Sequence, residues 1–229
     1  MKPLVIAHRG ASGRELENSL AAFRAAVALG ADGVELDIHS TADGELIVHH
    51  DASIRGMPIA QSPASDLARL RLRNGEPVPT LAQALDAIGM KLQVFVEIKV
   101  LDPRWDERLF ETLDRGPNPS GYAVHSFAFH VVRRLGDKRP DLPRGLLSEV
   151  YTRSPRKSLQ DASAHTLWQK RGTLDEELVK NVHEGGNRIF VWTIDAASEF
   201  ERALAWGVDG ICTNFPDRAR RVVEAAPVA

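Results

Sequence analysis

Residues 29–38 read LGADGVELDI, and residues 206–212 read WGVDGIC. In both places a helix-like pattern ends at a glycine, and an Asp-Gly pair then opens a run rich in Val, Ile and Leu. Glycine is typical of helix C-termini because it adopts the left-handed backbone without strain, whereas β-branched residues favour strands. We interpret the shared pattern as a recurrent helix–turn–strand unit. The repeat is too short to prove an internal duplication.

The same alternation of apolar runs and helical patterns continues along the chain. The predicted strands are residues 4–7, 34–38, 45–48, 92–100, 122–124, 145–147, 189–193 and 208–212. Strands separated by helices indicate parallel βαβ units, and about seven or eight units predict an α/β protein with the (β/α)₈ TIM-barrel fold. A doubly wound open sheet is the alternative, but no GxGxxG motif follows the first strand.

The chain of 229 residues fits one barrel domain over residues 1–229, since such barrels reach roughly 250 residues as one unit. Residues 51–79 contain several prolines and glycines, so we predict a small cap or insertion there, after the second strand. Four polar residues are predicted to cap helix N-termini: Asn18, Thr80, Thr173 and Asp195.

Charge and cysteine content exclude several classes of protein. Lys and Arg number 29 against 31 Asp and Glu, a formal net charge of −2, which argues against a nucleic-acid or membrane-surface binder. Cys212 is the single cysteine, so an intramolecular disulfide and a Cys-rich metal site are excluded. No apolar run reaches the ~20 residues of a membrane span, and we therefore expect a cytoplasmic protein without stable membrane insertion.

Charged residues alternate with apolar ones in two predicted strands. Glu35 and Asp37 share one face of the strand at 34–38, and Glu97 and Lys99 share one face of the strand at 92–100. If the apolar faces pack on helices, all four charged side chains converge inside the barrel. Three carboxylates against one lysine leave excess negative charge, which a hard cation such as Ca²⁺ or Mg²⁺ would neutralise. A solvated strand face and a structural ion pair remain the alternatives for each pair taken alone.

Histidines lie at the ends of two predicted strands. His8-Arg9-Gly10 follows the first strand, and His49-His50-Asp51 follows the strand at 45–48. A barrel carries its functional loops at these strand ends. Two histidines near a divalent cation suit phosphoryl chemistry, with one as general base and the other as general acid. Arg9 and Lys99 would then bind the anion.

The ordered motifs of the chain resemble those of the glycerophosphodiester phosphodiesterases. The match runs from residue 4 to about 217, and its spacing agrees as well as its residue types. The motifs are His8-Arg9-Gly10, Glu17-Asn18-Ser19, Glu35-Leu36-Asp37, Thr41-Ala42-Asp43-Gly44, His50-Asp51, Glu97-Ile98-Lys99, Ser126-Phe127, Val191-Trp192-Thr193 and Gly207–Thr213.

This resemblance implies a TIM-barrel enzyme that hydrolyses glycerophosphodiesters to an alcohol and sn-glycerol 3-phosphate with one divalent metal ion, Mg²⁺ or Ca²⁺. By position, the motifs imply catalytic His8 and His50, metal-binding Glu35, Asp37 and Glu97, and phosphate-binding Arg9 and Lys99. They also imply that Glu17 touches the substrate or ion directly or supports a residue that does, and that Trp192 forms an aromatic wall of the site. The family mechanism implies attack of the glycerol 2-hydroxyl on phosphorus, a cyclic phosphate, and its opening by water. The sequence leaves open which histidine is the base.

The chain departs from the family pattern in a few places. His50 is preferred over His49 because it directly precedes Asp51, and strand alternation turns His49 to the opposite face. The segment after Asp51 is short and keeps only Arg55 of the family motif, so the substrate is less firmly predicted than the chemistry. We interpret His125 as a structural histidine with satisfied hydrogen bonds.

Two other functions stay open at this point. One is a phospholipase D-like enzyme acting on lysophospholipid or sphingomyelin by the same cyclising chemistry. The other is a catalytically silent barrel that binds phosphodiesters. In each case the expected partner is a small molecule and no nucleic acid, with a homodimer allowed.

Overall fold

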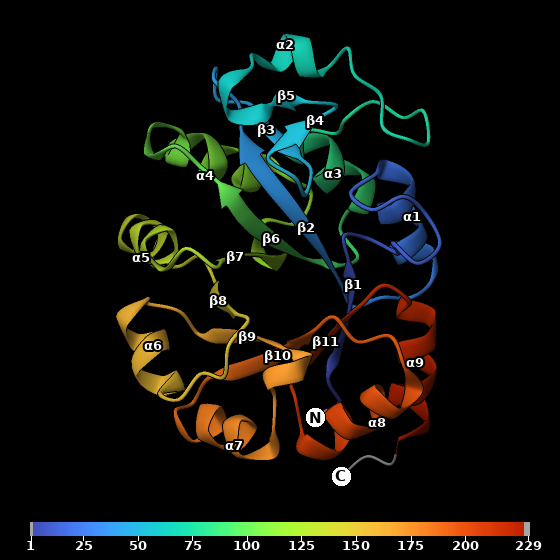
Figure 1. Ribbon diagram of the computed structural model, residues 1–229, viewed down its shortest axis with the longest axis vertical. Coiled ribbons are helices and arrows are strands. Elements are labelled where there is room, and N and C mark those ends of the chain that lie inside the picture. The colour runs from blue at the N-terminus through green and yellow to red at the C-terminus, as the bar shows by residue number, and fades with distance from the viewer. Residues whose placement is uncertain (1, 227–229) are drawn as a thin grey trace.

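The computed structural model describes residues 2–226, which form a closed barrel of eight parallel strands surrounded by helices (Figure 1). The barrel strands are β1 (Leu4–His8), β2 (Gly33–Ser40), β6 (Gln93–Val100), β7 (Tyr122–Ser126), β8 (Arg144–Ser148), β9 (Thr166–Lys170), β10 (Arg188–Trp192) and β11 (Gly210–Thr213). β1 pairs with both β2 and β11, which closes the sheet. The predicted TIM barrel is confirmed, and the open sheet is wrong.

Helices follow the strands and form the outer layer of the barrel (Figure 1). They are α1 (Leu20–Ala28), α3 (Leu81–Ile88), α4 (Asp106–Arg115), α5 (Phe129–Lys138), α6 (Pro155–Asp161), α7 (Glu176–Glu184), α8 (Ala197–Trp206) and α9 (Pro216–Ala225). Short 3₁₀ turns precede α4, β7 and α7: η2 (Pro103–Trp105), η3 (Pro119–Gly121) and η4 (Arg171–Thr173), respectively.

The chain leaves the barrel after β2 and forms the insertion that the proline and glycine content predicted. β3 (Leu46–Val48) runs antiparallel to β2, and the hairpin β4 (Ser53–Ile54) and β5 (Met57–Pro58) follows it. η1 (Ile59–Gln61) and α2 (Ala64–Leu67) complete the insertion before α3. It has a small apolar core of its own, made by Ile47, Ile54, Ile59, Leu67, Leu72 and Val78. At one end of the barrel this segment projects beyond the strands (Figure 1).

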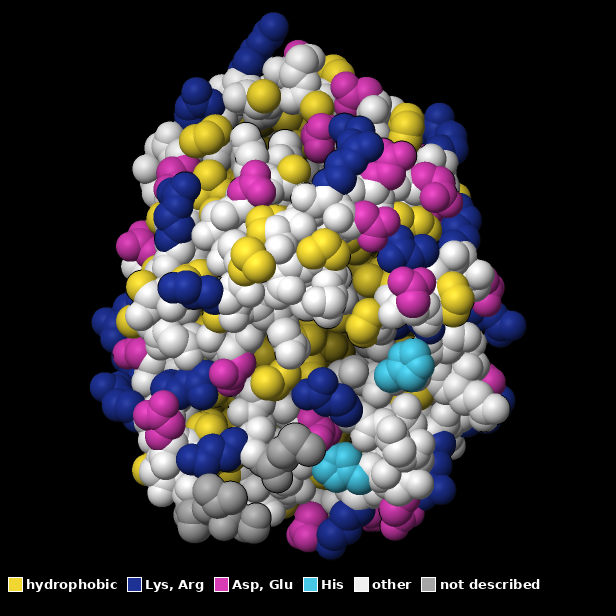
Figure 2. Space-filling view, turned by 180° about the vertical axis from the view of Figure 1, so that it is seen from behind, with side chains coloured by type: hydrophobic (Ala, Val, Ile, Leu, Met, Phe, Trp, Pro, Cys, Tyr) yellow, Lys and Arg dark blue, Asp and Glu magenta, His cyan; other side chains and the backbone are white. Residues whose placement is uncertain are grey.

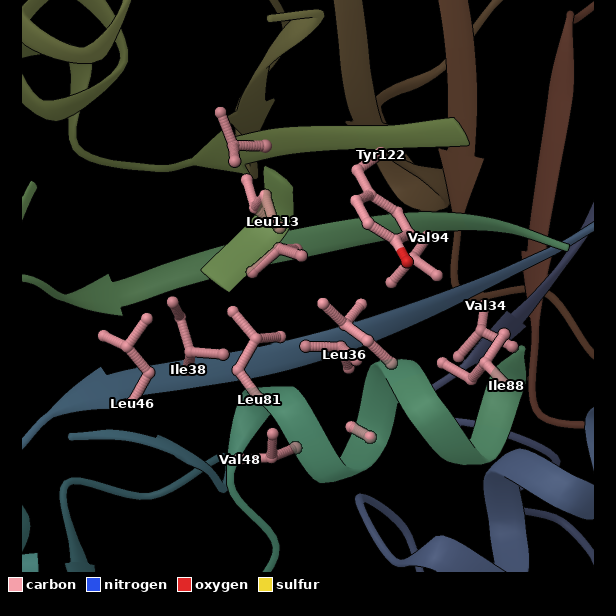
Figure 3. Close-up of a cluster of buried hydrophobic side chains, with 14 of the residues drawn as sticks. Val34, Leu36, Ile38, Leu46, Val48, Leu81, Ile88, Val94, Leu113 and Tyr122 are labelled. Atoms are coloured by element: carbon pink, nitrogen blue, oxygen red, sulfur yellow. The ribbon is translucent and has the colours of Figure 1, made fainter. Parts of the chain in front are cut away.

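The apolar face of β2 packs outward on α3, as strand alternation predicts. Val34, Leu36 and Ile38 are fully buried, and Figure 3 shows them close to Leu81 and Ile88 of the helix. Each such side chain stabilises the fold by roughly 1.5–3 kcal/mol on burial. Because one face of β2 is committed to this core, Glu35 and Asp37 must face the barrel interior.

The predicted N-caps agree with the structure at one helix and differ at the others. Thr80 caps α3 in a capping box, where its hydroxyl accepts from the Gln83 N–H at 3.3 Å. Asn18 is wrong as the cap of α1, because the Ser19 hydroxyl accepts from the Ala22 N–H instead. The Asn18 backbone has a φ of +54°, which turns its side chain into the barrel.

Two further cap predictions are wrong for a similar reason. Asp175, and not Thr173, caps α7 by accepting from the Leu178 N–H at 2.8 Å. Ala196 is the N-cap residue of α8, while Asp195 accepts hydrogen bonds from residues at the end of β11. Side chains that the local pattern assigns to helix ends therefore form hydrogen bonds with residues distant in the sequence instead.

Among the described residues, no helix combines the length and apolar character that a bilayer crossing requires. On the face seen in Figure 2, Lys and Arg side chains alternate with Asp and Glu, without a single large basic patch.

Candidate active site

The predicted acidic residues converge at the carboxyl ends of β1, β2 and β6. Strand register places His8 beside Glu35, and Asp37 beside Glu97. The three carboxylate residues are buried, with 3%, 0% and 7% of Glu35, Asp37 and Glu97 exposed. These ends border a cavity of about 110 Å³, which we call the mouth cavity. The predicted site residues that line it are His8, Arg9, Glu35, His50, Glu97, Lys99 and Trp192.

Asp37 lies beneath this cavity in a cage of donors. The Lys99 ammonium lies 3.1 Å from Oδ1 and the Arg9 Nε lies 3.2 Å from Oδ2. Asn18 Nδ2 donates to Oδ2 at 2.8 Å. Burial raises the pKa of Asp37, but Lys99, Arg9 and the Asn18 hydrogen bond outweigh burial and hold that pKa below its ordinary value. Asp37 is therefore an anion that fixes both cationic side chains.

Glu35 and Glu97 have the opposite electrostatics. Burial, followed by the charges of Asp37 and Glu97, raises the pKa of Glu35 well above its ordinary value. Burial and Asp37 raise the pKa of Glu97 to about 7, although Lys99 Nζ lies 2.6 Å from its Oε1. Neighbouring carboxylates without a neutralising cation resist ionisation in this way.

The donor set of these residues fits a divalent cation. Within the described part of the chain, Glu35 Oε1 and His125 Nδ1 are buried without a hydrogen-bond partner, and buried Glu97 Oε1 meets the Lys99 ammonium alone. Ligand atoms of the same three residues lie within 4.8 Å of one another. Buried polar atoms normally have partners, so an unpartnered group of this kind marks a place where an ion can bind.

His8 is fixed by a hydrogen-bond chain from the loop after β11. Asn214 Nδ2 donates to Asp195 Oδ2 at 2.7 Å, so its Oδ1 accepts from His8 Nδ1 at 2.8 Å. This orientation assigns the proton of the neutral ring to Nδ1 and leaves Nε2 as an acceptor. Burial, with a contribution from Arg9, lowers the pKa of His8 below its ordinary value of 6.5.

His50 is held differently. Its Nδ1 lies 2.9 Å from Asp51 Oδ1, and the His39 Nε2–H donates to its backbone carbonyl at 3.1 Å. His50 lines the mouth cavity, whereas His49 lines a neighbouring cavity of about 600 Å³ between Glu17 and the insertion. The two histidines thus face different cavities, as alternation predicted.

Glu17 does not line the mouth cavity but holds a residue that does. Both of its carboxylate oxygens accept from Arg9 Nη1 at 3.0 Å. Arg9 also donates its backbone N–H to Glu35 Oε2 at 2.9 Å. With a φ of +55°, Arg9 takes a left-handed turn that directs both its backbone and its guanidinium towards carboxylates.

Aromatic side chains form the opposite wall of the mouth cavity. The Trp192 Nε1–H donates to the Trp168 carbonyl at 3.1 Å, and its ring meets Phe127 edge-on at 5.6 Å. Trp168 stacks on His125, with ring centroids 4.3 Å apart and planes at 5°. Because His125 Nδ1 has no partner in the described residues, the expectation of a histidine with satisfied hydrogen bonds is wrong.

The sequence patterns missed several residues that shape this site. Asn214 and Asp195 orient His8, Asn18 orients Asp37, and His125 faces the mouth cavity. The available signal was position, since Asn214 and His125 lie at strand ends just as His8 does.

Comparison with known proteins identifies the family. The sequence model of the glycerophosphoryl diester phosphodiesterase family matches residues 8–218. The chain is 33% identical over 233 residues to a glycerophosphodiester phosphodiesterase of Caldanaerobacter subterraneus subsp. tengcongensis, covering 95% of this chain and 96% of that one. A crystal structure of a glycerophosphodiester phosphodiesterase from Parabacteroides distasonis superposes with a TM-score of 0.89 at 27% identity, covering 98% of both chains.

An Oleispira antarctica phosphodiesterase, solved in complex with the product sn-glycerol-3-phosphate, shares the fold with a TM-score of 0.90 at 22% identity over 97% of both chains. The family model and the 33% identical relative agree over nearly the whole chain. They show that this chain belongs to the glycerophosphoryl diester phosphodiesterase family.

Proposed function

We propose that the protein hydrolyses glycerophosphodiesters to sn-glycerol 3-phosphate and an alcohol at the mouth cavity. Membership of the family supports this reaction. The observation that carries the proposal is the pairing of His8 and His50 in one cavity with Arg9, Lys99 and the buried carboxylates. Such a cavity can bind a phosphodiester anion and move a proton on each side of it.

The acidic cluster supplies the cation site in this proposal. Glu35, Asp37 and Glu97 would hold one divalent ion, Mg²⁺ or Ca²⁺, whose chemistry when bound is to stabilise negative charge on the non-bridging phosphate oxygens. Arg9 and Lys99 contribute their own positive charge to the same oxygens, and Asp37 and Glu17 hold both cationic side chains in place.

His8 acts as the base in the first step. Its Nδ1 is committed to Asn214, so Nε2 accepts the proton of the glycerol 2-hydroxyl, whose oxygen then attacks phosphorus. A lowered pKa keeps His8 neutral near pH 7, which this role requires.

His50 acts as the acid in the first step. Asp51 holds its Nδ1, so the proton on Nε2 passes to the oxygen of the leaving alcohol as the bond from phosphorus to this oxygen breaks. A five-membered cyclic phosphate remains. In the second step His50 accepts a proton from water, the water oxygen attacks phosphorus, and His8 returns its proton to the 2-oxygen as the ring opens.

Hydrolysis of glycerophosphocholine tests the proposal. We expect sn-glycerol 3-phosphate and choline from the purified protein with Mg²⁺ or Ca²⁺, and loss of turnover after exhaustive EDTA treatment that readdition of the cation reverses. Undiminished turnover in EDTA would reject the cation site. A panel of glycerophosphodiesters with different alcohol groups extends the test. If the protein hydrolysed none of them, the proposed reaction would be rejected.

A lysophospholipase D-like activity is the second candidate, and one observation favours it. Phe127 and Val150 follow the ends of β7 and β8 and are 43% and 71% exposed, which gives an apolar surface near the mouth cavity. The same panel should therefore include lysophosphatidylcholine and sphingomyelin. The single domain over residues 1–229, the cytoplasmic location and a homodimer remain predictions from the sequence.

A further inference from the structure

We propose that His125 is a ligand of the bound cation, so that the site presents nitrogen as well as oxygen and prefers a first-row transition ion such as Mn²⁺. This inference rests on the proposed function only in using the same cation site. It departs from the all-oxygen donor set of Glu35, Asp37 and Glu97.

Strand register brings His125 to the carboxylates. His125 on β7 pairs directly with Glu97 on β6, which pairs in turn with Asp37 on β2. Parallel neighbours in register point to the same side of a sheet, so the imidazole faces the interior beside Glu97. A ligand atom of His125 lies within 4.8 Å of ligand atoms of both Glu35 and Glu97.

One nitrogen of the imidazole has no hydrogen-bond partner among the described residues. Residue His125 is 2% exposed, and its Nδ1 is buried without a hydrogen-bond partner among the described residues. A histidine that served packing alone would leave this polar atom uncompensated, at a cost in stability. The nearby Asp37 oxygens already meet Lys99, Arg9 and Asn18, and Glu97 Oε1 also meets Lys99. Glu35 Oε1 and His125 Nδ1 are therefore the ligand atoms with the most free capacity.

The ring is held in one orientation. Trp168 stacks flat on it at 4.3 Å, and Gly145 on β8 makes room for the indole. A Cβ at position 145 would lie 2.7 Å from Trp168 Cδ1 and 3.2 Å from the Cβ of His125. A ligand fixed before the ion arrives loses little freedom on binding, which favours affinity. Imidazole suits transition ions, whereas Mg²⁺ and Ca²⁺ prefer oxygen.

Pulsed electron paramagnetic resonance of Mn²⁺ tests the ligand directly, without substrate. We expect the metal-free protein, loaded with less than one equivalent of Mn²⁺, to show ¹⁴N modulation from a coordinated imidazole. The modulation should disappear in His125→Gln and in His125→Asp, where the aspartate keeps an anionic oxygen for the ion. His165→Gln, which changes an exposed histidine at the other end of the barrel, should retain it.

Competition between Mn²⁺ and Mg²⁺ gives a second readout. His125→Gln should lower the Mn²⁺ affinity by at least about tenfold and the Mg²⁺ affinity much less, since a nitrogen ligand favours the transition ion. Absence of ¹⁴N modulation in the wild type, or its persistence in folded His125→Asp, would overturn the proposal. Either result leaves glycerophosphodiester hydrolysis untouched, and failure of hydrolysis leaves the Mn²⁺ spectrum untouched.

Discussion

The two halves of the barrel share one backbone plan and differ in what points inward. In the charged half, β1, β2 and β6 bring His8, Glu35, Glu97 and Lys99 to the mouth cavity, with Asp37 paired to Lys99 beneath it. In the aromatic half, β8 to β10 fill the interior with Leu147, Trp168, Phe190 and Trp192. Strand pairing is parallel throughout the barrel in both halves.

The aromatic half mainly stabilises the fold, whereas the charged half supplies the groups for the chemistry. In the aromatic half, Trp168 meets Phe190 edge-on at 4.9 Å and Phe95 at 5.3 Å, contacts that stabilise the interior. In the charged half, the raised pKa values of Glu35 and Glu97 show that ionising these groups is unfavourable without a cation. Residues of the charged half should therefore affect turnover, and residues of the aromatic half should affect folding.

The largest effect on turnover should come from the two histidines. His8→Ala and His50→Ala should each lower kcat by about 10²–10⁴-fold on glycerophosphocholine, since each removes a proton-transfer group. A p-nitrophenyl glycerophosphodiester distinguishes their roles, because its leaving group needs no proton. In the first turnover, His50→Ala should therefore release p-nitrophenol at close to the wild-type rate and His8→Ala should not, as measured by rapid-mixing absorbance. The reverse pattern would exchange the assigned base and acid.

Phe190→Ala should have the largest effect on stability, because the ring is 1% exposed and touches Trp168 and Phe95. We expect the free energy of unfolding in urea to fall by about 3–5 kcal/mol. Activity of the folded fraction should stay within a few-fold of the wild type. An unchanged urea midpoint would show that the aromatic half does not carry the stability assigned to it.

The pH profile should show the lowered pKa of His8. The base must be neutral, so kcat/KM falls as pH decreases through this pKa. Burial and Arg9 disfavour the imidazolium form, and the midpoint of the acid limb should therefore lie below pH 6.5. A midpoint at or above 6.5 would contradict the electrostatics assigned to the charged half.

The smallest effect should come from charge outside the barrel. Lys157 on α6 pairs with Asp161 at 2.8 Å on an exposed helix face. Lys157→Ala should change the free energy of unfolding by less than about 0.5 kcal/mol and leave kcat/KM unchanged. A clear fall in kcat/KM would show that Lys157 takes part in substrate binding.

Periodicity was enough to predict the charged half because its strands are long and strictly alternating. Glu35 and Asp37 alternate with buried aliphatic residues, so both the outer core and the inward face followed from the sequence. Strand β9 (Thr166–Lys170) was missed because polar residues occupy both of its ends and position 169. Gln169 is fully buried, where it donates to the Val150 carbonyl and Thr173, so a polar residue occupies a core position.

Partners across the barrel could not be read from local patterns. Asn18 and Asp195 both lie directly before predicted helices, and both turn instead to residues on distant strands. His125 looked structural because its unpartnered nitrogen is visible only when β6 and β7 are placed side by side. Strand ends were predictable, but the hydrogen-bond networks that tune them depend on the closed barrel.

The claim that the charged half performs the hydrolysis is tested most directly by ³¹P nuclear magnetic resonance of glycerophosphocholine turnover. Glu97→Gln and Glu149→Gln form a matched pair, since both residues line the mouth cavity and lie on opposite halves. With Mg²⁺ present, the wild type and Glu149→Gln should produce the sn-glycerol 3-phosphate signal at similar rates, and Glu97→Gln should produce almost none. Equal rates in the two folded variants would contradict the account.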